Sequence, residues 1–136
     1  MHHRDTESAE RTEKSIDGLT ERIIGAAIEV HRVLGPGLLE SAYEECLAHE
    51  LVLREVSFRR QQPLPVHFKG VHLEVAYRLD FVVEDRVILE LKAIERILPV
   101  HEAQLLTYLR LAQIKWGLLL NFHAPVLKQG IRRMVN

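Results

Sequence analysis

Residues 77–92 read YRLDFVVEDRVILELK and predict a two-stranded hairpin. When the turn is centred on Asp85, alternate residues of the two strands face each other, and the apolar ones share one face. The apolar pairs are Val83 with Val87, Phe81 with Leu89, and Leu79 with Leu91. A slip of one residue would move this whole set to the opposite face, so the pattern itself specifies the register.

The opposite face of the hairpin carries charges. Asp80 lies across from Glu90, and Arg78 lies across from Lys92. Two opposed carboxylates repel each other, and a divalent cation between them relieves the repulsion, because hard oxygen ligands suit magnesium or manganese. Lys92 follows on the same strand face, where its ammonium group could stabilise an attacking hydroxide or a developing negative charge. This chemistry is typical of metal-assisted hydrolysis of a phosphodiester.

A simpler interpretation of this face is a ladder of cross-strand ion pairs on a solvated sheet. From the hairpin alone the ladder is preferred, because short motifs often match by chance.

Three motifs resemble the PD-(D/E)XK nuclease superfamily. Asp80 ends one strand and Glu90-Leu91-Lys92 lies on the next, as the superfamily motif requires. Residues 37–43, GLLESAY, match the GxxExxY signature of a small prokaryotic family within that superfamily. Residues 104–108, QLLTY, look like the Q-x-x-x-Y element of its exonuclease-like branch. The resemblance runs from about Leu19 to Asn136 and favours the functional interpretation of the hairpin.

The resemblance implies a restriction-endonuclease-like α/β core, with a mixed central sheet flanked by helices, and a Mg²⁺- or Mn²⁺-dependent nuclease. It also implies roles for individual residues. The catalytic set would be Asp80, Glu90, Lys92, Glu40 and Gln104. The metal would be held by Asp80 and Glu90, with the Leu91 carbonyl and Glu40 as further ligands. Tyr108 and Tyr43 would position the substrate. Glu40 also fits a plain helix-end role, because a carboxylate in the first turn is stabilised by the helix dipole.

Composition limits the alternatives. A chain of 136 residues fits one domain, and no apolar run approaches the roughly 20 residues that span a bilayer. We therefore expect a cytoplasmic protein with no membrane partner. The single cysteine, Cys46, excludes an internal disulfide and a four-cysteine metal site. The histidines show no paired-ligand spacing in the sequence, so a zinc hydrolase is not expected; they include His31, His49, His67, His72 and His123.

The charge balance bears on the partner. A formal net charge of -1 gives no global attraction to nucleic acid, so binding would need a local basic patch. The candidates for such a patch are Arg59, Arg60, Arg96, Arg110, Lys115, Lys128, Arg132 and Arg133. We expect a nucleic-acid partner, with DNA favoured over RNA although the sequence does not decide between them.

Periodicity predicts the remaining elements. Residues 1–18 are expected to form a flexible tail, followed by a single domain over residues 19–136. Apolar steps of three and four predict helices from Leu19, at 38–54, at 100–112 and at 126–134. Strands are expected at 58–62, 71–75 and 115–120, and Pro63 and Pro65 confine their segment to a sheet edge.

Two other functions fit the sequence. One is a noncatalytic module that keeps the nuclease-like core and binds nucleic acid or a larger protein, which small size and near-neutral charge favour. The other is a homodimeric structural protein.

Overall fold

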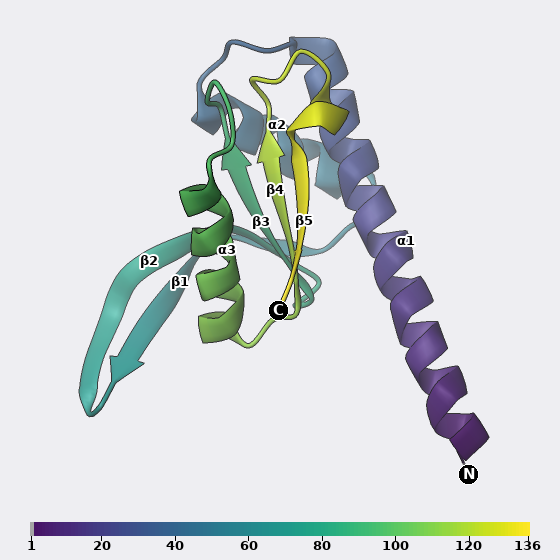
Figure 1. Ribbon diagram of the computed structural model, residues 1–136. Helices are drawn as coiled ribbons and strands as arrows, with labels where there is room; N and C mark the ends of the chain where they lie inside the picture. The colour runs from purple at the N-terminus through teal and green to yellow at the C-terminus, as the bar shows by residue number, and fades with distance from the viewer. Residues whose placement is uncertain (1) are drawn as a thin grey trace.

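The computed structural model describes the backbone of residues 2–136 and the side chains of residues 16–74 and 77–136 (Figure 1). Three helices, five strands and one short 3₁₀ helix follow one another along this part of the chain. In chain order they are α1 (His2–Leu34), α2 (Glu40–Leu53), β1 (Phe58–Phe68), β2 (Val71–Val83), β3 (Val87–Lys92), α3 (Pro99–Ala112), β4 (Trp116–Asn121), η1 (Leu127–Gly130) and β5 (Ile131–Val135).

The strands form one five-stranded sheet in the order β1-β2-β3-β4-β5. β3 and β4 run parallel, joined through α3, whereas the other neighbouring strands run antiparallel. Helices α1 and α2 lie on one side of the sheet and α3 lies on the other (Figure 1). The sheet is therefore mixed and flanked by helices, which confirms the predicted α/β, restriction-endonuclease-like fold.

Two hydrophobic clusters fill the space between the sheet and its helices. The larger one joins α1 and α2 to sheet residues such as Phe81, Leu89 and Leu118, and the smaller one joins α3 to residues such as Ile88 and Leu119. All residues of β3 from Val87 to Leu91 are buried, because this central strand is covered on both faces.

The predicted hairpin forms with the expected register. Val83 pairs with Val87, Val82 with Ile88, and Phe81 with Leu89. Leu79 departs from the predicted face: it packs in the α3 cluster rather than with Phe81. Phe81 and Leu79 are two residues apart yet lie in different clusters, so the alternation of faces is interrupted at Asp80, where the recorded pairing of β2 with β3 also ends.

The proline-containing segment behaves as predicted. β1 continues through Pro63 and Pro65 to Phe68 and is an edge strand, so no ladder hydrogen bond is lost on its outer side. Beyond the body of the sheet, β1 and β2 continue as a two-stranded arm that projects past α3 (Figure 1).

The predicted C-terminal helix at 126–134 is wrong. The chain forms η1 and then β5, which pairs antiparallel with β4. Ile131 and Met134 are three residues apart, which suggests one face of a helix. In the strand they lie on opposite faces instead, Ile131 against the α1–α2 cluster and Met134 against the α3 cluster.

Helix α1 starts earlier than the sequence pattern predicts. Its backbone is helical from His2, and Ile16 is 2% exposed within the larger cluster. The packed part of the chain therefore includes residues that were assigned to the tail, while the flexibility of residues 1–18 stays a prediction. Within the part of the chain that the structure describes, no helix is both long enough and apolar enough to cross a membrane.

Candidate functional site

The site begins where β2 and β3 separate. The recorded β2–β3 pairing stops at Phe81 and Leu89, and Asp80 is the residue of β2 just before Phe81. The Oδ2 atom of Asp80 accepts a hydrogen bond of 2.8 Å from the backbone N–H of Leu91. The Asp80 carboxylate is thus fixed against β3, on the strand segment that carries the predicted Glu-x-Lys motif.

Glu90 is the buried acid of this site. Its residue is only 6% exposed, and its Oε1 atom has no hydrogen-bond partner among the described residues. Burial, and after it the neighbouring Asp80 carboxylate, raise the pKa of Glu90 to about 10. The carboxyl group therefore stays protonated at neutral pH when no cation is bound, because two close carboxylates in a dry site do not both ionise.

Lys92 lowers the pKa of two of the acids, in contrast to the effects of burial and of Asp80. Its positive charge lowers the pKa of both Glu90 and Glu40, which places its ammonium group within electrostatic reach of each. Its backbone carbonyl accepts a 2.9 Å hydrogen bond from Phe122, and Lys92 is paired with Asn121 in the parallel ladder. The strand backbone under the lysine is therefore held on the β4 side.

The acid pair fits a divalent cation. An unpartnered carboxylate oxygen in a buried position costs free energy, and a cation bound to it would remove that cost. Among the described side chains, no three histidines, cysteines, aspartates or glutamates converge closely enough to form a complete metal site. Asp80 and Glu90 would thus supply two ligands, and backbone oxygen or water would supply the others.

Glu40 approaches from the other layer of the fold. It is the first residue of α2, and its residue is exposed. The pKa of Glu40 is raised by partial burial of the carboxyl group and then by the charge of Asp80. The structure therefore brings Glu40 towards Asp80 and Lys92, although it does not complete a three-carboxylate site with Asp80 and Glu90.

Tyr43 lies in the hydrophobic core. Its residue is 0% exposed, and its ring stacks on Phe122 with centroids 4.6 Å apart. The hydroxyl group donates to the Gly35 carbonyl at 2.6 Å and accepts from the Leu38 N–H at 3.0 Å. Both hydrogen bonds hold the loop in front of α2. The tyrosine therefore fixes the loop that presents Glu40, and its role in positioning the substrate stays a prediction.

Removal of this hydroxyl should loosen the loop. We expect Tyr43→Phe to lower the free energy of unfolding by about 1–3 kcal/mol, because it leaves a partly buried carbonyl and N–H without their partner. Chemical denaturation would measure the change. Tyr77→Phe is the matched control, since Tyr77 is 49% exposed. Equal stability of the two variants would contradict the assigned role.

Gln104 and Tyr108, four residues apart on α3, lie near the same site. Tyr108 is 8% exposed, and its hydroxyl is hydrogen bonded to the Gln104 side chain. Burial raises the pKa of Tyr108, and the charges of Glu90, Tyr77 and Asp80 act in the same direction. Gln104 and Tyr108 thus come together beside the acid pair, as their spacing predicts. His101 has a structural contact: its Nδ1 accepts the Leu98 N–H at 2.9 Å at the start of α3.

A sequence model of the PD-(D/E)XK nuclease superfamily matches residues 17–134. This chain belongs to the PD-(D/E)XK nuclease superfamily. Neither the comparison with curated proteins nor the comparison with solved structures returns a match. The membership supports a nuclease-like function in general, and members of this superfamily generally use divalent metal ions.

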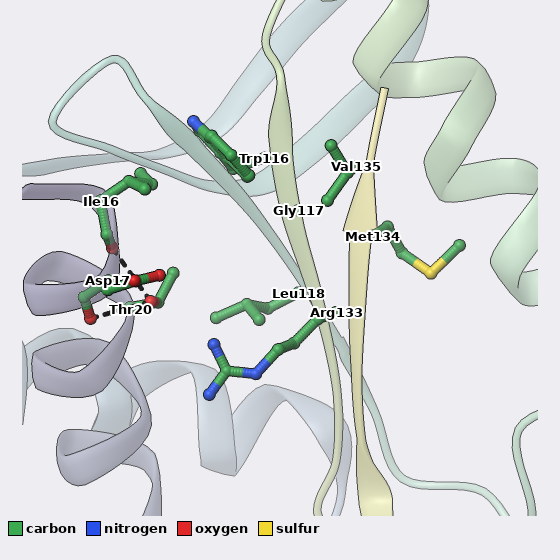
Figure 2. Close-up of a pocket in the computed structure, with 9 residues that line it drawn as sticks. All are labelled: Ile16, Asp17, Thr20, Trp116, Gly117, Leu118, Arg133, Met134 and Val135. Carbon is green, nitrogen blue, oxygen red and sulfur yellow. Dashed lines mark hydrogen bonds between the residues drawn. The ribbon is translucent and has the colours of Figure 1, made fainter. Parts of the chain in front are cut away.

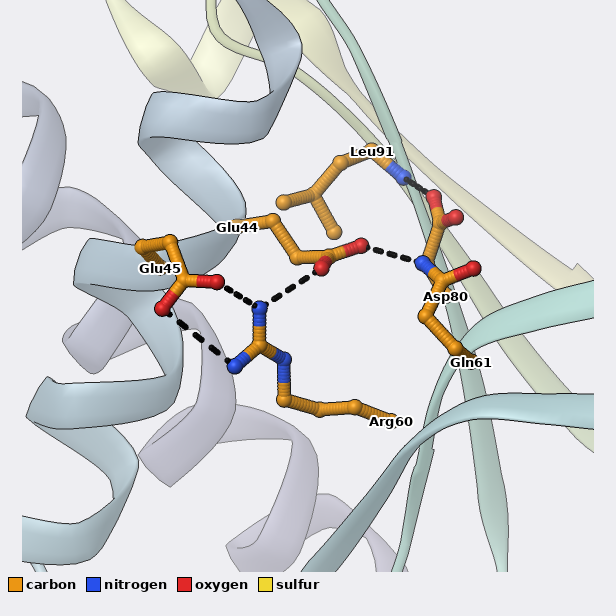
Figure 3. A network of polar contacts seen from close by, with 6 residues as sticks. All are labelled: Glu44, Glu45, Arg60, Gln61, Asp80 and Leu91. Atoms are coloured by element: carbon orange, nitrogen blue, oxygen red, sulfur yellow. Dashed lines mark hydrogen bonds and ion pairs between the residues drawn. The ribbon is translucent and has the colours of Figure 1, made fainter.

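Two sets of contacts in this PD-(D/E)XK protein hold the elements around the site and were not predicted. Arg60 lies between Glu44 and Glu45 of α2, with contacts of 2.7 and 2.5 Å, and Gln61 donates to Glu44 at 2.6 Å (Figure 3). These contacts tie α2, which carries Glu40, to β1. They join residues far apart in the sequence, so no local pattern indicates them.

Asn121 makes the second set of contacts. Its side chain accepts the Ile94 N–H at 3.1 Å and donates to the Ile94 carbonyl at 2.9 Å. Asn121 also accepts the His123 N–H at 3.2 Å and is 3% exposed. A buried asparagine at the end of an apolar strand is the one signal in the sequence that could have drawn attention to it. It fixes the loop that follows Lys92.

A separate pocket lies between α1 and the β4–β5 edge (Figure 2). Its walls include Ile16 and Thr20 of α1 and Trp116 and Arg133 of the strands. The Thr20 hydroxyl is engaged with the carbonyls of Ile16 and Asp17. None of the predicted site residues lines this pocket, so it is not part of the acid site.

Proposed function

We propose that this protein is a Mg²⁺- or Mn²⁺-dependent nuclease whose active site is built on Asp80, Glu90 and Lys92. One observation supports this most directly. The buried Glu90 carboxyl group has an oxygen without a partner, and it lies beside Asp80 and within reach of Lys92. A ladder of surface ion pairs would leave its acids solvated and paired.

The roles of the residues follow from their positions. Asp80 and Glu90 would hold the metal together with the Leu91 carbonyl. When bound, the metal would lower the pKa of a water molecule and neutralise charge on the phosphate. The Lys92 ammonium group would stabilise the attacking hydroxide and the negative charge that develops on the phosphoryl oxygens.

The supporting residues act around this centre. Glu40 would orient a water molecule or complete the ligand set through water, because it is coupled to Asp80 from α2. Gln104 would orient a phosphate or Lys92, and Tyr108 would position the substrate by stacking or by its hydroxyl group. The GLLESAY stretch at 37–43 supports membership of the GxxExxY family, since its glutamate and tyrosine form the presented acid and its loop anchor.

The substrate we propose is nucleic acid, with DNA favoured over RNA. The basic residues available for a phosphate backbone are fewer than the sequence suggests. Arg59 is paired with Asp85 at 2.6 Å, Arg60 with Glu44 at 2.7 Å, and Arg132 with Glu102 at 3.5 Å. We therefore expect a single chain to bind the phosphate backbone of nucleic acid weakly. A larger protein partner or a homodimer would strengthen this binding. A cytoplasmic location remains an expectation from the sequence.

The direct test is digestion under defined metal conditions. Linear duplex, circular duplex and single-stranded DNA, and RNA, are incubated with the purified chain and Mg²⁺, Mn²⁺ or a chelator. We expect cleavage of at least one substrate with either metal and none with the chelator. A calorimetric manganese titration should show one site. If Mn²⁺ binds at one site but no substrate is cleaved, the noncatalytic binding module is the better description.

A further inference from the structure

The β1–β2 arm carries a pair of facing histidines near its end. His67 of β1 and His72 of β2 are direct partners in the antiparallel register. The strands turn at Lys69 and Gly70, both of which have positive φ, 44° and 86°. Because directly opposed residues project to the same face, the two imidazoles lie together on the exposed arm.

The two rings face each other through the same atom. Nδ1 of His67 lies 2.8 Å from Nδ1 of His72, and the ring centroids are 4.2 Å apart. A hydrogen bond at this distance requires one ring to carry a proton on Nδ1 while the other presents a lone pair. The pair therefore shares one proton in a position that a metal ion could occupy.

Glu74 is the carboxylate nearest to His72 on the arm among the described side chains. Its Oε1 atom lies 3.8 Å from Nε2 of His72, on the far side of that ring from His67. This distance is an ion-pair approach and not a hydrogen bond. A rotation of the exposed Glu74 side chain that closes the gap would favour the tautomer with its proton on Nε2, which leaves Nδ1 of His72 free to act as a ligand. Histidines that bind metal commonly have such a carboxylate behind the ring.

The distances are compatible with chelation. Two nitrogens bound at about 2.0–2.1 Å to a tetrahedral zinc ion lie about 3.3 Å apart. Opening the pair by about 0.5 Å is a small movement for exposed side chains on a two-stranded arm. Imidazole nitrogen also selects a different ion from the oxygen ligands of the acid site, because it suits Zn²⁺ and its neighbours rather than Mg²⁺.

We propose that His67 and His72 chelate one Zn²⁺ ion through their Nδ1 atoms, with Glu74 behind His72 and water completing the coordination. The site is distinct from the acid pair and does not depend on nuclease activity. The ion links β1 to β2 next to the turn. Because an isolated two-stranded hairpin is only marginally stable, this link holds the arm in its extended form.

Zinc binding is tested by calorimetric titration of the full chain with ZnCl₂. Excess Mg²⁺ is present throughout, so that it occupies the acid site. His2→Ala and His3→Ala are introduced in every protein, because these two adjacent imidazoles could also bind Zn²⁺. We expect one Zn²⁺ per chain. His67→Gln and His72→Gln should each weaken binding at least about tenfold, and Glu74→Gln should weaken it by up to about tenfold. His123→Gln, an exposed histidine elsewhere, is the matched control.

Limited trypsin digestion gives a second readout, because Lys69 is in the turn of the arm. Zn²⁺ should slow cleavage after Lys69, and His67→Gln should abolish this protection. The proposal is overturned if both histidine variants bind Zn²⁺ as tightly as the parent protein, or if the protection is the same in His67→Gln. The substituted side chains are exposed, so the variants are expected to fold.

Discussion

Asp80→Asn is expected to lower nuclease activity at least about a hundredfold, below detection in most assays. Even groups that only support a metal ligand cost 10–100-fold when they are removed, and Asp80 is proposed as a ligand itself. The change removes the negative charge while it keeps an oxygen that can accept the Leu91 N–H. The fold should therefore survive, and the loss should come from weaker metal binding.

Asp85→Asn is the matched control, because it makes the same change on the same hairpin. Asp85 lies in the turn and is paired with Arg59 on the surface. Cleavage rates as a function of Mn²⁺ concentration, together with calorimetric Mn²⁺ affinity, would compare the two variants. Equal cleavage by Asp80→Asn and Asp85→Asn would refute the proposed active site. If the wild-type protein cleaves no substrate, but Asp80→Asn still loses Mn²⁺ binding, the protein is better described as a binding module.

The second large effect concerns stability. We expect Glu90→Gln to stabilise the metal-free protein, and by more as the pH rises. The folded pKa of Glu90, about 10, lies above its ordinary value of 4.5. The stability that this group contributes is thus fully present below about pH 4.5 and is lost as the pH rises towards the folded pKa. Glutamine has no proton to take up on folding and avoids this loss.

The expected difference is measurable. Each pH unit in this window is worth at most about 1.4 kcal/mol. We expect the advantage of Glu90→Gln over the wild type to be about 2 kcal/mol larger at pH 8 than at pH 5, since water entering the site reduces the full effect. Urea denaturation in the presence of a chelator would measure it, with the exposed Glu21→Gln as control. A pH-independent difference would show that Glu90 is ionised in the folded protein.

Added Mn²⁺ should reduce the stability advantage of Glu90→Gln over the wild type, because only the wild type offers two carboxylates to the ion. A gain in stability on removing Glu90, combined with a loss of metal binding, would indicate that the acid is retained for function at the expense of stability.

Much of the site followed from the hairpin pattern. Alternation of apolar and charged residues predicted the pairs Phe81–Leu89 and Val83–Val87. It also predicted that Asp80 and Glu90 lie close together, as their electrostatic interaction shows, although they are not recorded as a strand pair. The pattern failed in two places. Leu79 lies on the face opposite Phe81, next to the point where the β2–β3 ladder ends. Residues 131–135 form a strand although their apolar spacing suits a helix. Both errors arise because tertiary pairing overrode a local period.

The sequence by itself predicted that Asp80, Glu90 and Lys92, the residues proposed for the chemistry, lie on one face of the hairpin, because side chains alternate along a strand. The tertiary structure alone decided that Glu90 is buried with an unpartnered oxygen, that Tyr43 holds a loop, and that His67 faces His72. Local periodicity encodes the direction in which a side chain points. Burial and facing partners depend on segments brought together by packing, and no single stretch of the chain contains that information.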